Sequence, residues 1–302
     1  MNLFDKLVEQ ALERSDLTVT LQPVVEKELL HHDILREMSH AGLLTGLTFI
    51  GGTCLRACYN SPRMSEDLDF TGGADFTYAS LHDLGTVLEQ RLSTKYGLEV
   101  RVSDPVCDDT TVATWKIKVE TRPESKNLPL QRINIDICAI PSYDAKPAML
   151  NNYYGVDMGT AGLILQAQSR EEILADKYVA FAFRNRIKNR DLWDILWLQR
   201  QGVKIPVALL PDKLNDHRQR VDVFVAELEK RSRNLRQNDQ LRQDFIFEMR
   251  RFLPINLVES TINNPDFWTV VVNHVQQGCD EIILAVRGDV PDTVDNRQAV
   301  FP

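Results

Sequence analysis

The sequence lacks any long apolar run: no stretch approaches the about 18 apolar residues that a membrane-spanning helix requires. Its first residues do not combine a basic stretch with an apolar one, which is the signature of a secretory signal peptide. Cysteine is scarce as well: its five copies are odd in number and scattered, without the paired spacing of a zinc site or a disulfide framework. We therefore expect a cytoplasmic protein with reduced thiols and no membrane association.

The sequence also has no excess of positively charged residues. The 302 residues carry 35 lysines and arginines against 43 aspartates and glutamates, a net charge of −8. A protein that coats nucleic acid non-specifically would be basic, so this balance argues against such a role but leaves room for a local basic cleft. Hydrophobic residues make up 43% of the chain, which is ordinary for a globular protein of one large or two medium-sized domains.

Two adjacent glycines open the most informative stretch. The apolar residues 47–50 predict a strand, and Gly51 and Gly52 come directly after it. Without a Cβ, such glycines let the backbone approach a phosphate closely. Residues from Thr53 to about Tyr59 predict a short helix whose free N–H groups would point at an anion. A Gly-Gly pair by itself is more often a plain turn, so the phosphate interpretation depends on the residues downstream of the helix.

Asp67 and Asp69 supply the second part of this stretch. They are separated by one apolar residue, Leu68, so on a strand both carboxylates lie on one face while Leu68 turns to the core. Two carboxylates on one face suit Mg²⁺, which prefers hard oxygen ligands and keeps phosphates in its remaining positions. An isolated Asp-x-Asp is usually a solvated strand end, and its combination with the preceding glycines is what favours a phosphate-and-metal site.

Residues 132–140 alternate almost ideally between two faces of a predicted strand. Three isoleucines would face one way, whereas Asn134, Asp136 and Cys138 would face the other. A carboxylate among isoleucines is costly unless it is paired, hydrogen-bonded or metal-bound. Asp136 is therefore either part of a functional site or a solvent-exposed residue on an edge strand.

The dominant pattern changes from strand to helix near residue 166. Helices are predicted at residues 3–14, 23–41 and 78–96, strands at residues 98–102, 113–119, 132–140 and 161–166, and a loop at residues 141–160. From residue 169 to about residue 286 every strong pattern is helical, and a frayed tail is expected from residue 289. The predicted class is α+β, with a mixed sheet flanked by helices in residues 1–166 and a helical domain in residues 167–302.

A predicted helix begins with a capping box at Ser169, where glutamate follows three residues later. Within this helix, Lys177, Phe181 and Arg184 stand at i, i+4 and i+7 and so share a face. A basic pair on a partly apolar face fits side chains that snorkel over the edge of a core, and it fits a phosphate-binding face equally well. The spacing alone leaves both interpretations open.

Residues 190–194 read Arg-Asp-Leu-Trp-Asp and begin the next predicted helix. At this position Asp191 and Asp194 could simply cap the helix and favour its dipole. The charged helical stretch at residues 217–251 is typical of a solvated face, and a subset of its basic residues could bind RNA.

Taken together, these motifs resemble the DNA-polymerase-β-like nucleotidyltransferases, whose signature is a strand, a Gly-Gly, a short helix and a strand bearing Asp-x-Asp. Gly-Gly-Thr-x-Leu at residues 51–55 and Arg-x-Ser-x-Asp-Leu-Asp-Phe at residues 63–70 are similar to the AbiEii/MenT group of toxin nucleotidyltransferases. The resemblance covers roughly residues 20–200. It implies a polymerase-β-like nucleotidyltransferase domain followed by a helical domain, with the active cleft between them.

The resemblance also implies roles for individual residues. The metal would be bound by a triad of Asp67, Asp69 and Asp136, and Asp136 would help to deprotonate the attacking hydroxyl. Lys177 would lie over the triphosphate, while Asp191 and Asp194 would orient it or close the cleft. The implied catalytic residues are Asp67, Asp69, Asp136, Lys177 and Asp191, and the implied nucleotide-binding residues are Gly51, Gly52, Thr53, Arg63, Ser65, Lys177, Arg184 and Asp194.

The activity that the resemblance implies is that of a Mg²⁺-dependent toxin of a two-gene toxin–antitoxin system. Such a protein would transfer a nucleotide from an NTP to an RNA acceptor, with the 3′ end of tRNA as the expected target, and so block translation; a cognate antitoxin would be its partner. Transfer to a small molecule or a protein hydroxyl stays open, as does a nucleotide-binding module without turnover. The acidic chain favours a small or protein acceptor weakly, and the large helical part favours RNA weakly.

Overall fold

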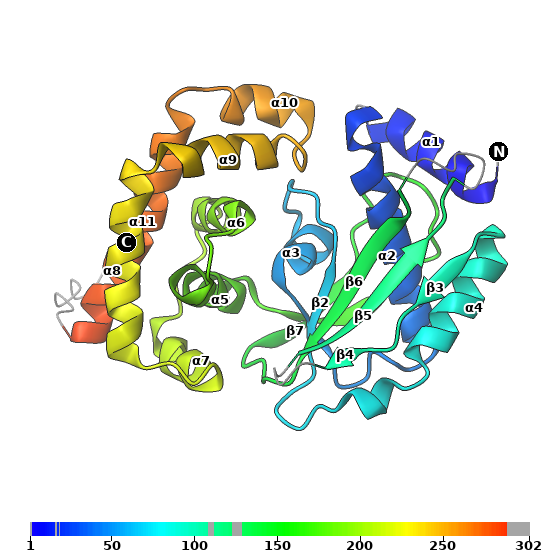
Figure 1. The fold of residues 1–302 in the computed structure, drawn as a ribbon, viewed down its shortest axis with the longest axis horizontal. Coiled ribbons are helices and arrows are strands. Elements are labelled where there is room, and N and C mark those ends of the chain that lie inside the picture. Colours follow the sequence, from blue (N-terminus) through cyan, green and yellow to red (C-terminus); the bar gives the residue numbers. More distant parts are fainter. Residues whose placement is uncertain (1, 16, 18, 108–111, 123–128, 289–302) are drawn as a thin grey trace, which may run out of the picture.

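The structure is a computed structural model that describes residues 2–15, 17, 19–107, 112–122 and 129–288 (Figure 1). The helices are α1 (Leu3–Ser15), α2 (Gln22–His40), α3 (Gly51–Tyr59), α4 (Leu84–Tyr96), α5 (Arg170–Phe183), α6 (Asn189–Arg200), α7 (Leu210–Asp216), α8 (Val221–Gln237), α9 (Asp239–Met249), α10 (Ile255–Leu257) and α11 (Phe267–Arg287). The strands are β1 (Thr48–Ile50), β2 (Leu68–Thr71), β3 (Val100–Val102), β4 (Val106–Cys107), β5 (Val112–Val119), β6 (Gln131–Cys138), β7 (Ala145–Met149) and β8 (Ile164–Gln168). Short 3₁₀ turns lie at Val19–Leu21, Tyr78–Leu81 and Val207–Leu209, and a π-helical turn at Val258–Ile262.

The strands form one mixed sheet, which confirms the predicted α+β class. Its order is β3-β5-β6-β2-β1-β8-β7, with β4 paired to β5. The parallel pairs are β2 with β6 and β1 with β8, and the remaining pairs are antiparallel. Because β2 and β6 are parallel neighbours in the middle of the sheet, residues at the same register on the two strands point to the same face.

The core is built from the alternation that the sequence shows. On β6 the side chains of Ile133, Ile135 and Ile137 are at most 1% exposed, as are Leu68 and Phe70 on β2. The opposite face of the same two strands is therefore left for polar side chains. This alternation places the carboxylates of β2 and β6 on one surface of the sheet.

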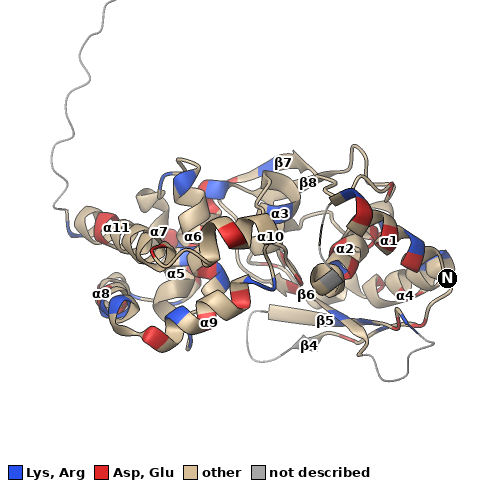
Figure 2. Cartoon of the chain, turned by 90° about the horizontal axis from the view of Figure 1, so that it is seen from above, with Lys and Arg blue, Asp and Glu red and all other residues tan. Residues whose placement is uncertain are grey.

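The helices fall into two groups along the long axis of the molecule. Figures 1 and 2 show α1, α2 and α4 gathered around the β3–β5–β6 end of the sheet, and α5 to α11 gathered at the other end, with α3 between them. Helix α3 contacts β1, β2 and β8 on one side and α5 and α6 on the other. The short helix after the two glycines is thus the element through which the sheet meets the helical half.

Several boundaries differ from the sequence-based expectation. The helix expected at residues 78–96 begins only at Leu84, after a 3₁₀ turn, and α3 begins at Gly51 rather than at Thr53. The segment expected to be a loop contains β7, an edge strand with mostly exposed residues and therefore without an apolar alternation. The tail expected from residue 289 lies outside the described residues.

Half of the predicted capping box is confirmed: the Ser169 hydroxyl accepts a hydrogen bond from the Glu172 backbone N–H at 3.1 Å. The return bond is not made, because the Ser169 backbone N–H donates to the Asp144 carbonyl and the Glu172 carboxylate pairs with Lys213 instead. All the strands described end by Gln168, and the described elements from Arg170 onward are helical. A division of the chain into two domains near residue 166 stays a proposal. Among the helices that the structure describes, none combines the length and the apolar character needed to span a membrane.

Candidate active site

A pocket of about 260 Å³ lies where β1, β2, β6 and α3 meet α5 and α6. The structure brings most of the residues singled out in the sequence to its wall. These are Gly51, Gly52, Arg63, Ser65, Asp67, Asp69, Asp136, Lys177, Arg184 and Asp191. A larger cavity of about 470 Å³ lies among α9, the π-helical turn and α11, but no carboxylate lines it, so it lacks the groups for metal-assisted chemistry.

Three carboxylates form one wall of this pocket. Asp69 and Asp136 are register partners on the parallel strands β2 and β6, so their side chains leave the sheet side by side. Asp67 precedes β2 by one residue, and one of its carboxylate oxygens accepts a hydrogen bond from the Asn134 backbone N–H at 3.0 Å. One oxygen of Asp136 accepts a hydrogen bond from the Thr114 hydroxyl at 2.7 Å. Each carboxylate is therefore anchored or aligned by the sheet itself.

The proximity of these carboxylates contributes to the raised pKa values of Asp69 and Asp136. Burial, followed by repulsion from Asp136 and Asp67, raises the pKa of Asp69 to about 6. Burial also raises the pKa of Asp136, although its hydrogen bond from Thr114 lowers it in part. Such mutual repulsion is the electrostatic condition that a bound cation relieves.

The carboxylate oxygens of this wall are the kind of ligand that Mg²⁺ prefers. They are not, however, arranged to hold a metal ion as they stand: within the described ranges, no group of three His, Cys, Asp or Glu side chains could do so. Asp67 and Asp136 each commit one oxygen to the sheet and keep the other for a ligand. A cation here would draw these free oxygens and the Asp69 carboxylate together by side-chain rotation.

The two glycines are required by side chains rather than by the backbone alone. Gly51 has φ +75°, and a Cβ on it would lie 2.9 Å from a carboxylate oxygen of Asp69. A Cβ on Gly52 would lie 2.2 Å from Nη2 of Arg63. The glycines therefore let the carboxylates and a buried guanidinium close onto the start of α3, where no side chain caps the free N–H groups.

Thr53 does not line the pocket. Its side chain is 2% exposed, and its hydroxyl is hydrogen-bonded to the Ser65 hydroxyl at 2.6 Å and to the Asp67 carbonyl. This contact fixes the turn that leads into β2. Thr53 thus positions Ser65 and Asp67, which do reach the pocket.

The opposite wall is a buried network of ion pairs. The Lys177 ammonium lies 2.6 Å from one oxygen of Asp191 and 2.8 Å from one of Asp194. The Arg63 guanidinium donates to both oxygens of Asp194, at 2.8 and 2.9 Å, and Arg184 pairs with the second oxygen of Asp191. Burial alone would lower the pKa of Lys177, but Asp191 and Asp194 more than offset this and the pKa is raised, so the lysine is charged.

Asp194 is fully buried and does not reach the pocket. Burial tends to raise its pKa, but Arg63 and Lys177 dominate and lower it. It therefore acts as an anionic centre that holds two cations. Arg63 comes from the segment before β2 and Asp194 from α6, so this ion pair joins the sheet to the helical half.

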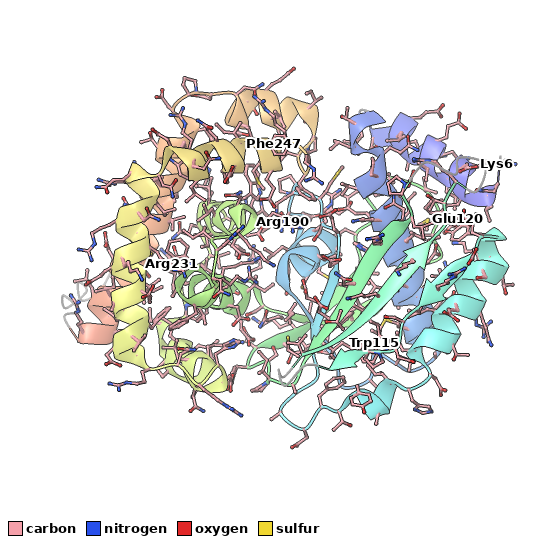
Figure 3. All side chains as sticks on the ribbon, viewed as in Figure 1. Lys6, Trp115, Glu120, Arg190, Arg231 and Phe247 are labelled. Atoms are coloured by element: carbon pink, nitrogen blue, oxygen red, sulfur yellow. The ribbon has the colours of Figure 1, made fainter. Side chains whose placement is uncertain are left out.

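Sequence reasoning missed other residues of the pocket. Lys188 lines it from the segment between α5 and α6, Arg190 from the first turn of α6, and Gln168 and Asp176 from β8 and α5. Arg190 lies between α6 and α3 (Figure 3), where it pairs with Glu66 and Glu248 at 3.4 and 3.1 Å. The alternation of basic residues along residues 184–190 was a signal that could have found Lys188 and Arg190, and it does not extend to Gln168 or Asp176.

Comparison with known proteins gives one family and several structural neighbours. Residues 33–273 match the model of a family described as nucleotidyl transferase AbiEii toxin, type IV toxin–antitoxin system. MenT4, a nucleotidyltransferase toxin from Mycobacterium tuberculosis H37Rv, has 15% sequence identity and a TM-score of 0.52 over 92% of this chain and 98% of its own. Two Helicobacter pylori proteins, one described as a nucleotidyltransferase and the other named JHP933, have identities of 17% and 16% and TM-scores of 0.47 and 0.46. They cover 89% and 88% of this chain and 98% and 94% of their own. No curated protein sequence matches significantly.

The raised pKa of Asp69 gives a prediction about stability. A carboxyl that is harder to ionise in the folded state destabilises the protein at neutral pH, and the penalty is complete above the folded pKa of about 6. It disappears as the pH falls toward the unfolded value near 4. We expect Asp69→Asn to raise the free energy of unfolding at pH 7 by about 1–2 kcal/mol, since partial exposure screens the charge.

Urea unfolding of the wild type and Asp69→Asn in EDTA between pH 4 and pH 8 measures this difference. The gap should close toward pH 4. A variant that is less stable than the wild type at pH 7 would mean that a favourable partner holds this carboxylate.

The close approach of the Arg63 guanidinium to Gly52 gives a second prediction, which concerns stability. In Gly52→Ala the new methyl group displaces the guanidinium from Asp194, and we expect a loss of about 1–3 kcal/mol in the free energy of unfolding. Gly85→Ala is the matched control, because a Cβ there meets Val102 at an ordinary 3.7 Å. Equal melting temperatures for the two variants would show that Arg63 moves aside without cost.

Proposed function

This chain belongs to the AbiEii family of nucleotidyl transferase toxins of type IV toxin–antitoxin systems, and from that premise we propose how it acts. It is a Mg²⁺-dependent enzyme that transfers a nucleotide from an NTP to an RNA acceptor, the 3′ end of tRNA, and thereby blocks translation. A cognate antitoxin opposes it in the cytoplasm. One observation carries the proposal: three carboxylates on the sheet face a charged lysine across one pocket.

The carboxylate wall is the metal and acceptor side of the proposed reaction. Asp67, Asp69 and Asp136 would hold Mg²⁺, which, when bound, supplies positive charge to the phosphates and to the attacking oxygen. Asp136 accepts the proton of the acceptor hydroxyl, because its anchored carboxylate faces the pocket next to Asp69. The free N–H groups of α3 bind a phosphate oxygen.

The cationic wall is the leaving-group side. Lys177 reaches the β- and γ-phosphates and stabilises the departing pyrophosphate. Asp191 and Asp194 hold the lysine in place from behind, so they act through Lys177 rather than on the triphosphate. Arg63 and Arg184, which also line the pocket, add positive charge on this side.

The carboxylates proposed to bind the metal give a prediction about the rate of nucleotide transfer. Asp67→Ala and Asp69→Ala should each lower the transfer rate by about two to three orders of magnitude, since each removes a carboxylate that would hold the Mg²⁺ against the reacting phosphate. The assay incubates the protein with each labelled NTP, Mg²⁺, total tRNA and cell extract, and separates labelled RNA, protein and small molecules. Asp83→Ala, at an exposed residue outside the pocket, is the matched control.

Near-wild-type transfer by either variant would contradict the metal assignment. Label on a protein or a small molecule, with none on RNA, would replace the RNA acceptor by one of those classes.

Lys177 gives the prediction for the leaving-group side. Lys177→Ala should raise the KM for NTP and lower kcat together, a loss of about 2–4 kcal/mol in transition-state stabilisation. Lys177→Arg should recover only part, because a planar guanidinium does not replace a point charge. Lys95→Ala is the matched control, since Lys95 also pairs with a buried carboxylate, Asp33, at 2.5 Å but lies on α4.

Lys177→Ala and Lys95→Ala should each lose some stability, because each removes one partner of a buried carboxylate. Kinetic constants are therefore taken per folded molecule, at a temperature below the melting transitions of both variants. If Lys177→Ala turns over NTP normally, the triphosphate is held by Arg63, Arg184 or Arg190 instead.

A further inference from the structure

Residues 184–190, which join α5 to α6 and include the first two residues of α6, carry a high concentration of positive charge. Arg184, Arg186, Lys188 and Arg190 occupy alternate positions, and residues 184–190 include no acidic residue. The segment therefore contributes four positive charges in a chain whose net charge is −8. Such a local excess needs an explanation, because like charges this close repel each other unless anions are nearby.

Two of the four cations are already paired with carboxylates within the protein. Arg184 pairs with Asp191, and Arg190 pairs with Glu66 and Glu248. Arg186 and Lys188 differ: in the part of the chain that the structure describes, neither side chain has an ion pair or a hydrogen bond, and both residues are exposed. The segment thus presents two uncommitted cations to solvent.

Lys188 and Arg186 line two adjoining cavities. Lys188 lines the pocket that holds Asp69 and Asp136. Arg186 lines a groove of about 730 Å³ that the same segment forms with α8 and α9. The segment is therefore the common wall between the candidate active site and a larger open groove.

The groove is lined by amides as well as by charges. Asn185, Asn234, Asn238 and Gln240 contribute side-chain amides, and Arg231 adds a guanidinium. Amides donate and accept hydrogen bonds and so suit the edges of unpaired bases. Glu227 and Asp244 also line the groove, but Glu227 is paired with Lys230 and Arg231, and Asp244 accepts a hydrogen bond from the Gln240 amide.

We propose that residues 184–190 guide the phosphodiester backbone of a single-stranded RNA end into the active site. Lys188 binds the phosphate nearest the acceptor nucleotide at the rim of the pocket, and Arg186 binds the next phosphate in the groove. This inference rests on the proposed transfer to RNA and adds the path by which the acceptor enters.

The surrounding surface supports this assignment to one segment. On α8 and α9 basic and acidic residues are interspersed (Figure 2), and Lys230 in the groove is paired with Glu227 at 2.9 Å. The neighbouring helices therefore offer little net attraction for a polyanion. The positive charge that a phosphate chain would follow is concentrated in the segment between α5 and α6.

The test compares Arg186→Gln and Lys188→Gln with the wild type in transfer of labelled nucleotide to total tRNA. Each variant should raise the KM for tRNA by roughly 5- to 10-fold, because one phosphate contact is lost. The slope of log affinity against log salt concentration should become shallower by about 0.7–0.9 for each lost contact. For Arg186→Gln, the KM for NTP should stay within about 2-fold of the wild type.

Arg200→Gln is the matched control. Arg200 is an exposed arginine with no ion pair among the described residues, at the far end of α6, roughly 16 Å along the helix from its start. It should leave the KM for tRNA and the salt slope unchanged. Melting curves of all three variants should coincide with that of the wild type, because the replaced side chains are exposed.

The outcomes separate this inference from the proposed function. If the wild type labels tRNA and Arg186→Gln matches Arg200→Gln in KM and salt slope, the backbone path is wrong and the RNA acceptor stands. If Arg186→Gln raises the KM for NTP as much as that for tRNA, the segment binds the triphosphate instead. If the wild type labels a protein and no RNA, both the acceptor and the path are wrong.

Discussion

The site depends on one buried ion pair, between the guanidinium of Arg63 and the carboxylate of Asp194. The two groups are 2% and 0% exposed and meet through two hydrogen bonds. A buried Arg63 guanidinium without this carboxylate would be strongly destabilising, so the sheet and α6 must stay together. The same carboxylate holds Lys177 at 2.8 Å, and the lysine is thereby fixed opposite the aspartates. The guanidinium fits only because residue 52 is a glycine. A single contact thus unites the glycine motif, the lysine and the two halves of the structure.

The aspartates on the other wall make the opposite kind of contribution. Burial and repulsion from its neighbours raise the pKa of Asp69 to about 6, so its charge costs folding free energy instead of adding to it. The protein retains these aspartates opposite an ion-pair network in which three cations, Arg63, Lys177 and Arg184, share two carboxylates. A pocket with repelling anions on one side and a clamped cation on the other suits a ligand that brings both a metal and several phosphates.

The sequence predicted the strands and the pocket residues better than it predicted their contacts. The alternation on β6 identified its two faces, and the spacing of Asp67 and Asp69 brought both to one pocket. The pattern could not show that Asp194 is buried behind Lys177, because both a capping residue and a buried ion-pair partner fit the start of a helix. Nor could it show that Gly52 makes room for Arg63, which lies in a separate segment of the chain. Strand β7 was not predicted, because an exposed edge strand has no alternation of apolar and polar residues. Contacts between distant segments are what a single sequence leaves out.

The most direct test of this account is a crystal structure of the protein with a non-hydrolysable NTP and Mg²⁺. The account predicts the triphosphate between the start of α3 and the Lys177 ammonium, with the metal bound by oxygens of Asp67 and Asp69 and with the Arg63–Asp194 pair intact. A nucleotide bound elsewhere, such as in the cavity lined by Phe245 and Trp268, would contradict it. So would a triphosphate in this pocket that makes no contact with Lys177.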